Sequence, residues 1–187
     1  MFHYPVDDEV ELRLFEMRHA DELFALAEEN RDHLLRFLPW IEDIHSYIDT
    51  RQFIREGLTQ FANNDGFQAG IWYCNTLVGC IGYHSIDWAN RRSEIGYWLD
   101  RGHQGRGIMT RSVRALTDYA FRVYGLNRII LRCAVENARS RAVAERLGFQ
   151  FEGVLREDLY VNFRYVDHAL YGMLAHEWHA LNAPAVT

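Results

Sequence analysis

The sequence predicts an α+β protein built as a single compact domain. Apolar residues recur at helical intervals through most of the first third, whereas from residue 67 they follow the two-residue period of strands. Beyond residue 100, helical and strand segments alternate. The 187 residues suffice for one hydrophobic core and are too few for two domains of ordinary size. We therefore expect one domain with its core over about residues 9–175.

The first third is expected to be mainly helical. A short strand-like run, EVELRLF, occupies 9–15, and leucines at helical spacing then predict two helices within 20–40 that kink near Asn30. Apolar residues at similar intervals predict a third helix over 47–61, and the NNDG turn at 63–66 ends it.

The middle of the chain changes to the strand period. Polar turns separate apolar runs at 67–74, 77–87 and 92–100, an order that predicts an antiparallel meander. Helical spacing returns over 109–123 and stops before Gly125, a residue type common just beyond a helix.

The last third predicts a strand, a short helix and a hairpin. The β-branched run NRIILRCAV at 127–135 is typical of a buried strand, and NARSRAVAERLGF at 137–149 predicts a helix that a glycine closes. Alternating runs at 150–160 and 163–174 predict the hairpin. From Glu177 onward we expect a frayed end.

Charge and composition exclude several classes of function. The formal net charge is −6, whereas a nucleic-acid-binding protein needs a basic surface against phosphates, so we expect no direct nucleic-acid partner. All 20 basic residues are arginine. Without lysine the chain has neither a Walker A phosphate loop nor a Schiff-base nucleophile.

No segment predicts export, membrane insertion or metal binding. The N-terminus lacks a charged stretch followed by an apolar one, and no run of about 18 apolar residues occurs, so we expect a soluble cytoplasmic protein with no membrane partner. Cys74, Cys80 and Cys133 lack metal-ligand spacing and lie in strand-like runs, where we expect buried thiols. His176 and His179 form HEWH, which is not the HExxH zinc motif.

The stretch HQGRGIMTRS, residues 103–112, combines a flexible turn, a cation and a helix start. Gly105 and Gly107 let the main chain approach a ligand closely, and amides at the start of a helix face an anion. Arg106 and Arg111 add positive charge. The arrangement predicts a diphosphate site, although a glycine pair before a helix also occurs as a plain turn and the motif GxGxxG is incomplete here.

Gly96 sharpens this interpretation. It interrupts the strong strand SEIGYWLD, where a glycine usually marks a bulge or the close approach of another backbone. A strand distorted there would leave amides and carbonyls free to pair with an extended, amide-bearing ligand, as in β-strand addition. Coenzyme A fits both features, because its pantetheine arm carries two amides and its pyrophosphate would lie at the glycine turn.

Three motifs in order, EIGYWLD, QGRGIMT and NARSRAVAERLGF followed by EGVLRE, resemble the Gcn5-related N-acetyltransferase (GNAT) superfamily in its ribosomal-protein (RimJ/RimL) branch. The resemblance covers about residues 12–173. Gln104 to Met109 match its Q/R-x-x-G-x-G/A pyrophosphate motif except at Met109, where the family has glycine or alanine. It implies an α/β/α layered fold with a mixed, mostly antiparallel sheet of six or seven strands and helices on both faces.

The resemblance also implies where acetyl-CoA binds. The strand that contains Gly96 would part from the strand at 127–135, and the ligand would enter between them. Asn137 and Ser140 would lie near the thioester. Pantetheine would pair with Tyr97, Trp98 and Leu99, and the pyrophosphate would be held by Gln104, Gly105, Arg106, Gly107, Ile108, Met109 and Thr110.

Acetyl transfer to an amine needs a neutral nucleophile, a polarised carbonyl and a proton for the departing thiolate. An α-amine with a pKa near 8 is already about 10% neutral at pH 7, whereas a lysine amine must be deprotonated at a cost of about 4 kcal/mol. An α-amine acceptor therefore demands little of the base. No metal is required.

Ser140 would donate near the thiolate by resemblance, although a serine at a helix start is often only a cap. The candidate bases are Glu157, Asp158 and Glu94, while several family members have an acidic residue where this chain has Leu159. A covalent acetyl-enzyme on Cys133, with His168 and Asp167, is rejected because a thiol in the middle of a strand is typically inert.

Recognition of the acceptor is expected on the helical third and the turn at 84–92. Polar and aromatic residues mix in NRDHLLRFLPW and HSIDWANRR as in many peptide sites, although ordinary packing explains such mixtures too. The residues expected to contact the acceptor are Arg31, His33, Trp40, His84, Asp87 and Trp88.

The residues and the resemblance together predict an acetyl-CoA-dependent N-acetyltransferase that acts on the N-terminal α-amine of a ribosomal protein. Two alternatives remain open. The acceptor is a small amine, such as a polyamine, an amino acid derivative or an aminoglycoside, or else the protein is an inactive CoA-binding regulatory module. Exposed aromatic residues and assembly among relatives favour a homo-oligomer.

Overall fold

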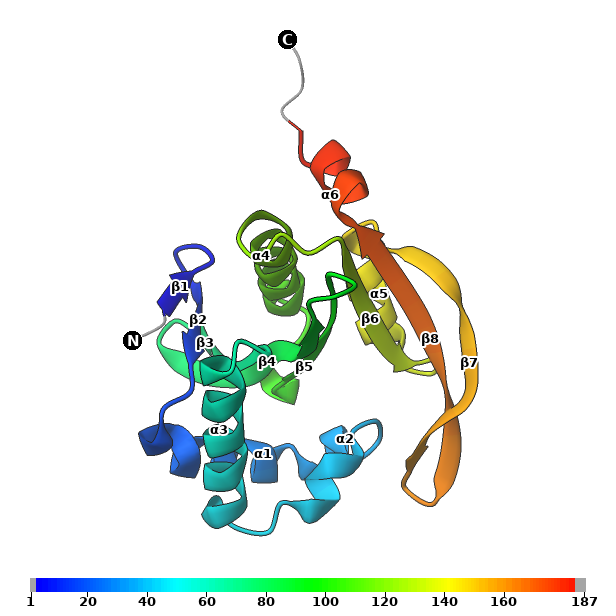
Figure 1. Ribbon diagram of the computed structural model, residues 1–187. Coiled ribbons are helices and arrows are strands. Elements are labelled where there is room, and N and C mark those ends of the chain that lie inside the picture. Colours follow the sequence, from blue (N-terminus) through cyan, green and yellow to red (C-terminus); the bar gives the residue numbers. More distant parts are fainter. Residues whose placement is uncertain (1–2, 184–187) are drawn as a thin grey trace.

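The computed structural model describes residues 3–183, which form one eight-stranded sheet with helices on both faces (Figure 1). The sheet order is β1-β2-β3-β4-β5-β6-β8-β7. The strands are β1 (His3–Pro5), β2 (Val10–Leu14), β3 (Phe67–Tyr73), β4 (Thr76–Asp87), β5 (Arg92–Leu99), β6 (Arg128–Ala134), β7 (Gln150–Val161) and β8 (Arg164–Leu174). The helices are α1 (Ala20–Glu29), α2 (Arg31–Leu34), α3 (Tyr47–Ala62), α4 (Ile108–Arg122), α5 (Ala138–Arg146) and α6 (Ala175–Leu181), with 3-10 turns η1 (Met17–His19), η2 (Pro39–Asp43) and η3 (Arg101–His103).

The expected layered, mostly antiparallel fold is confirmed, with one strand more than predicted. The extra strand, β1, pairs its three residues with β2 at the edge of the sheet. Three residues are too short to show a period, and Pro5 is tolerated because it lies on an edge strand.

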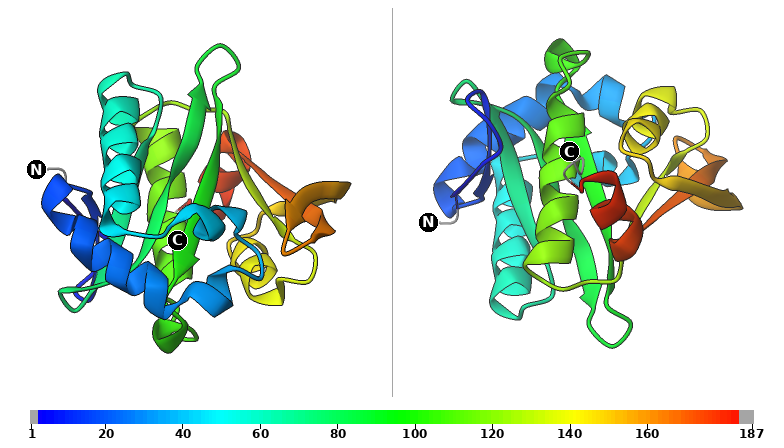
Figure 2. Two further views of the ribbon diagram at one scale, coloured as in Figure 1. Left: turned by 90° about the horizontal axis from the view of Figure 1, so that it is seen from below. Right: turned by 90° about the horizontal axis from the view of Figure 1, so that it is seen from above.

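The helical third covers one face of the sheet, as Figure 2 shows. Leu23 of α1 and Ile54 of α3 are buried in a cluster that includes Trp72 and Trp98 of the sheet. The side chain of Ser46 accepts a hydrogen bond from the Ile48 amide and begins α3.

The predicted break at Asn30 is confirmed, and it links the helices to the rest of the site. Asn30 separates α1 from α2 and is only 3% exposed. Its Nδ2 donates to the Leu26 carbonyl, and its Oδ1 accepts from the Arg101 amide at 2.8 Å. The turn after β5 is therefore tied to the helical third.

The long amphipathic helix α4 covers the opposite face (Figure 2). Val113, Leu116 and Ala120 are buried in the main core together with Ile81 and Ile95 of the sheet. The two faces of the sheet therefore carry separate apolar clusters, one with α1 and α3 and one with α4.

The sheet parts between β5 and β6, as expected. This is the one parallel pairing in the sheet of the described chain, and its register ends at Glu94 with Ile130. Because β5 continues to Leu99 and β6 to Ala134, their C-terminal halves leave each other's backbone groups unpaired.

The C-terminal segment differs from the prediction of a frayed end at Glu177. The Leu174 amide donates to Glu177 Oε2 at 2.9 Å and begins α6, and Trp178 is 1% exposed in the main core. A helix of seven residues is too short for its period to be recognised in the sequence. The part of the expected tail beyond 183 lies outside the described residues.

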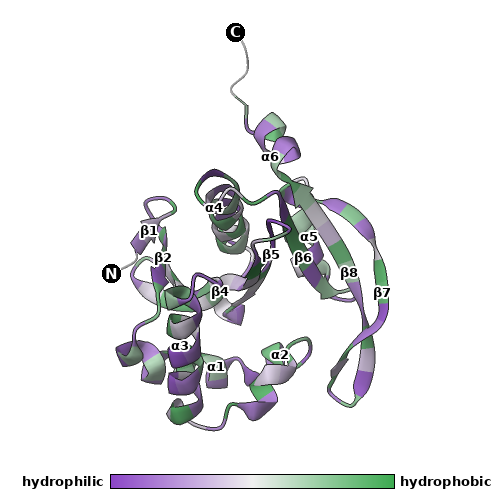
Figure 3. Ribbon diagram, viewed as in Figure 1, coloured by the Kyte–Doolittle hydropathy of each residue, from purple (hydrophilic) through white to green (hydrophobic). Residues whose placement is uncertain are grey.

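The hairpin of β7 and β8 forms one side of the molecule (Figure 1). Figure 3 shows hydrophobic and hydrophilic residues alternating along β7. Cys80 and Cys133 are buried as predicted, whereas Cys74 is exposed because it lies in the tight turn between β3 and β4 with a φ of 47°. Between residues 3 and 183, no helix has both the length and the apolar character needed to span a bilayer.

Candidate functional site

The turn between β5 and α4 presents backbone amides at an open helix start. Gly105 and Gly107 have φ values of 78° and 72°, a left-handed conformation that glycine adopts without strain. Gly107 is the N-cap residue, and within the described chain no side chain caps α4. A Cβ on either glycine would meet nothing within 4 Å. The turn thus has the free amides and the space that a diphosphate needs.

Of the arginines that supply positive charge around this turn, only Arg106 was predicted from the sequence. Arg111, expected to add free charge, is bound by Asp7 at 2.8 Å and by Glu9 at 3.1 Å. Three other arginines around the turn, Arg106, Arg139 and Arg146, make side-chain hydrogen bonds only to neutral groups of residues 3–183. Arg101 lines a small pocket with Arg139 and His33.

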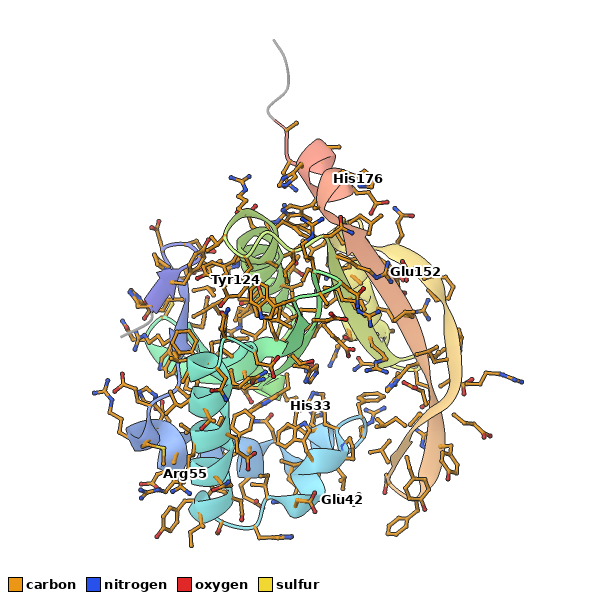
Figure 4. All side chains as sticks on the ribbon, viewed as in Figure 1. His33, Glu42, Arg55, Tyr124, Glu152 and His176 are labelled. Atoms are coloured by element: carbon orange, nitrogen blue, oxygen red, sulfur yellow. The ribbon has the colours of Figure 1, made fainter. Side chains whose placement is uncertain are left out.

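Two neighbours orient Gln104, the first residue of the pyrophosphate motif. Its Nε2 donates to His33 Nε2 at 2.8 Å, and its Oε1 accepts from Arg139. Burial and then the charges of Arg101 and Arg139 hold the pKa of His33 below its ordinary value, so His33 accepts as a neutral ring. In Figure 4, His33 lies on the side of α2 that faces the sheet. His33 therefore contacts the glycine turn through Gln104, whereas it was expected to contact the acceptor.

Gly96 does not mark a bulge in β5, contrary to the prediction. It pairs in regular register with Gly82, and the shift in register lies in β4 between Tyr83 and Ile86. A Cβ at Gly96 would overlap the imidazole of His84. The glycine therefore makes room for a side chain on the neighbouring strand.

Tyr97 and Ser140 meet on the α5 side of the parted strands. The Tyr97 hydroxyl lies 2.8 Å from Ser140 Oγ. Burial raises the pKa of Tyr97 well above its ordinary value, so it remains a neutral phenol at pH 7. Asn137 accepts from the Ser140 amide at 3.2 Å and is the N-cap of α5. The hydroxyl of Ser140 is therefore not used as the cap.

A cavity of about 590 Å³ passes through the gap between β5 and β6. It is lined by Tyr97 and Cys133, which belong to the core on the α4 face, and by Trp98, which belongs to the cluster under α1 and α3. Successive strand residues face opposite sides of a sheet. The cavity is therefore lined by residues from both faces, and we call the α1–α3 side the acceptor side.

Charged residues line the acceptor side. Arg132 donates to both oxygens of Glu94, at 3.2 and 2.9 Å, and to Asp158 Oδ2 at 3.2 Å. The same Asp158 oxygen lies 2.7 Å from His168 Nδ1. The hydrogen bond with His168 and the charge of Arg132 hold the pKa of Asp158 below its ordinary value.

Some residues expected at the acceptor or catalytic site lie in this cavity. Trp40, His84, Glu94 and Asp158 all line it. Glu157 does not, because its φ of 52° turns it out of the strand and its side chain is exposed, while its amide donates to Asp167 at 2.8 Å. We do not retain it as a base.

Arg31, Asp87 and Trp88 are also absent from the cavity lining. The guanidinium of Arg31 binds Glu28 and the carbonyls of η2 and its flank. Asp87 accepts from Asn90 and Arg92 within its own turn, and Trp88 Nε1 donates to the Asn64 carbonyl at 2.7 Å. These side chains stabilise turns, so the polar-aromatic mixture of HSIDWANRR reflects packing except at His84.

Cys133 lines the cavity but is 9% exposed, and burial raises its pKa. A thiol with a raised pKa is a poor nucleophile, which agrees with direct transfer. Between residues 3 and 183, no group of three or more His, Cys, Asp or Glu side chains could hold a metal ion.

Residues 9–150 match the family model of the acetyltransferase (GNAT) domain. This chain belongs to the GNAT family. Its fold, with the parted strands and the glycine turn, is the GNAT fold, and the family comprises acetyltransferases whose members bind CoA or acetyl-CoA in solved structures.

The chain matches several GNAT proteins over nearly their whole length. The chain is 38% identical to the "Putative ribosomal N-acetyltransferase YdaF" of Bacillus subtilis, covering 95% of this chain and 98% of the relative. It is 31% identical to the ribosomal-protein-serine acetyltransferase of Escherichia coli, covering 90% and 94%. A solved structure of RimL, a ribosomal L7/L12 α-N-protein acetyltransferase in complex with coenzyme A, superposes with a TM-score of 0.91 at 30% identity, covering 94% and 99%.

Sequence reasoning overlooked Arg132 and gave His168 no role on the acceptor side. A signal for Arg132 was available, because a charged residue inside the apolar run NRIILRCAV needs a carboxylate partner when the strand is buried. The partners of Arg132 are 38 and 26 residues away in sequence, and only the fold identifies them.

Proposed function

We propose that this GNAT protein transfers acetyl from acetyl-CoA to the N-terminal α-amine of a protein, and that the acceptor is a ribosomal protein. The observation that carries the proposal is the cavity between β5 and β6, because side chains from both faces of the sheet line it where the two strands have parted. Direct transfer requires two substrates to meet at one point from different directions. The names of the relatives support ribosomal proteins as the acceptor class.

In this proposal acetyl-CoA is held mainly by backbone groups. The pantetheine amides pair with β5 at residues 97–99, where β6 has moved away, and the diphosphate accepts from the amides of residues 104–110. Arg106 adds charge at the turn. Ser140 and the capping residue Asn137 lie beside the thioester, and the Tyr97 hydroxyl is hydrogen-bonded to that of Ser140.

An α-amine is favoured over a polyamine by the charges of the acceptor side. Glu94 and Asp158 would attract a polycation if they were free, but Arg132 binds both and cancels much of their charge. The decisive measurement is release of free thiol from acetyl-CoA with a peptide that begins with serine and, separately, with spermidine. We expect turnover of the peptide and little of spermidine.

The opposite preference would make the protein a small-amine acetyltransferase. No thiol release with either amine, despite tight binding of acetyl-CoA, would instead identify a regulatory module. Mass spectrometry of the peptide product would separate α-amine acetylation from acetylation of a lysine placed within the same peptide.

We also propose a cytoplasmic homo-oligomer that associates through the β7–β8 hairpin. This hairpin exposes four large aromatic side chains, more than a monomer usually leaves in water on one element: Phe151, Tyr160, Phe163 and Tyr165. Analytical ultracentrifugation of the wild type and of Phe163→Ser is expected to show dissociation in the variant. A monomeric wild type would refute the proposal.

A further inference from the structure

The acceptor amine arrives mainly as an ammonium ion and must lose a proton before it attacks the thioester. The proton acceptor has to lie on the acceptor side of the gap. Four carboxylate and imidazole side chains line the cavity there: Glu94, Asp158, His84 and His168. Their surroundings distinguish them.

Arg132 occupies both carboxylates. It donates to both oxygens of Glu94 and to Oδ2 of Asp158. A proton could be added to Glu94 only by displacing the guanidinium, and the hydrogen bond with His168 and the charge of Arg132 hold the pKa of Asp158 below its ordinary value. Glu94 and Asp158 are therefore better suited to holding Arg132 and His168 in place than to accepting a proton.

His168 is held with one ring nitrogen available. Its Nδ1 lies 2.7 Å from Asp158 Oδ2, and an ionised carboxylate only accepts, so Nδ1 carries the hydrogen. In the neutral ring, Nε2 then carries the lone pair. Among residues 3–183, no group hydrogen-bonds to Nε2. The side chain is 12% exposed and borders the cavity.

The sheet register places His168 on the acceptor side. β8 pairs His168 with Ala134, and Ala134 is two residues from Arg132 on β6, so the three side chains share one face. The charged groups nearest to this imidazole are Asp158 on β7, Arg132 on β6 and, beyond it, Glu94 on β5. His84 lies over Gly96 instead, and no carboxylate within the described chain orients it.

We propose that His168, oriented by Asp158, is the general base of the acetyl transfer, a role that deepens the proposed function and rests on it. Nε2 takes one proton from the acceptor ammonium and later releases it to water. The neutral nitrogen attacks the carbonyl carbon, the new N–C bond forms, and the C–S bond breaks. Ser140 gives its hydroxyl proton to the departing sulfur and regains one from the nitrogen, which leaves an amide and free CoA thiol.

The test uses the full-length enzyme, a serine-initiated decapeptide and acetyl-CoA. In His168→Gln we expect kcat/KM at pH 7 to fall about 100- to 1,000-fold, while the acetyl-CoA Kd measured by calorimetry stays within about twofold. The loss should shrink at least about tenfold at pH 9.5, where the amine is neutral without help. A purely structural role would not produce this narrowing. His179→Gln, on the exposed side of α6, is the matched control and should behave as wild type.

A His168→Gln enzyme with at least a third of wild-type activity and an unchanged pH profile would overturn the role of His168. If this variant also loses acetyl-CoA binding, His168→Ala with added imidazole decides: recovered turnover supports the base, and no recovery overturns it. Failure of the acceptor proposal gives a different result, because the wild-type enzyme itself would then leave the peptide unmodified. Spermidine would then replace the peptide as the acceptor in the test of His168. A wild type that acetylates neither amine would overturn both proposals.

Discussion

The coenzyme side and the acceptor side of this site are built in different ways. The proposed coenzyme side is one continuous stretch, residues 97–110, in which two left-handed glycines and a helix start expose backbone amides. The acceptor side is assembled from side chains on β4, β5, β6, β7 and β8 that meet only in the folded sheet. A backbone site tolerates most side-chain changes except at its glycines, whereas a side-chain site depends on every partner.

Gly107→Glu is the strongest test of the backbone side. A non-glycine residue at a φ of 72° costs about 1–2 kcal/mol, and a carboxylate at the helix start repels the diphosphate that the helix dipole would attract. We expect the acetyl-CoA Kd to rise about 100-fold or more by calorimetry.

Gly125→Glu is the control for that variant, because Gly125 is also left-handed, with a φ of 64° and nothing within 4 Å of an added Cβ, but follows the other end of α4. It should lose similar stability and keep its affinity for acetyl-CoA. Equal affinities in the two variants would mean that the ligand does not use the start of α4.

Ser140→Ala tests the junction between the two sides. The hydroxyl that faces Tyr97 is removed, but the amide of residue 140 still donates to the Asn137 cap, so the helix should remain intact. We expect kcat to fall about 10- to 100-fold with an unchanged acetyl-CoA Kd.

Asn137→Ala supplies the contrast, since losing the cap should cost about 1 kcal/mol of unfolding free energy in urea titrations. A Ser140→Ala enzyme with wild-type kcat would remove Ser140 from the chemistry and leave it a packing role beside Tyr97.

The same difference explains what the sequence could predict. Most helices, and strands of five or more residues, show their period, so the architecture followed from the sequence, while β1 has only three residues and α6 only one buried side chain. The glycine turn is local, and its left-handed glycines and helix start followed from the sequence, whereas most of the arginines around it did not. Arg132, Asp158 and His168 come together only through the register of β6, β7 and β8, which no local pattern encodes.

Gly96 and the turn after β4 show how local interpretation fails. A glycine within a strand predicted a bulge in β5, but the reason for it is a ring on the neighbouring strand. Asp87 and Trp88 are residue types that are common in binding sites. Here the hydrogen bonds of Asp87 close its own turn, and Trp88 binds the carbonyl of Asn64.

Arg139→Gln tests whether side chains assist the coenzyme side. Arg139 holds Gln104 and adds a charge that no described carboxylate neutralises. We expect a rise of about three- to tenfold in the acetyl-CoA Kd at low salt, which shrinks as salt screens the phosphate charge. Arg156→Gln on the exposed hairpin is the control and should leave the Kd unchanged. A loss independent of salt would indicate that Arg139 acts by positioning Gln104.

Asp87→Asn is expected to have the smallest effect and to spare acetylation altogether. Hydrogen bonds from Asn90, followed by Arg92, hold the pKa of Asp87 below its ordinary 3.8. Because the folded pKa is the lower one, ionised Asp87 stabilises the fold above about pH 4, and this contribution disappears as the pH falls through the folded pKa. Urea unfolding should therefore show the variant slightly less stable than wild type at pH 7, and the difference should shrink as the pH falls below about 4. Asp8→Asn, at another exposed carboxylate, is the control for the substitution itself. Reduced peptide acetylation in Asp87→Asn would show that this turn contributes to acceptor binding. It would contradict the distinction between a turn that only closes itself and a site assembled by the sheet.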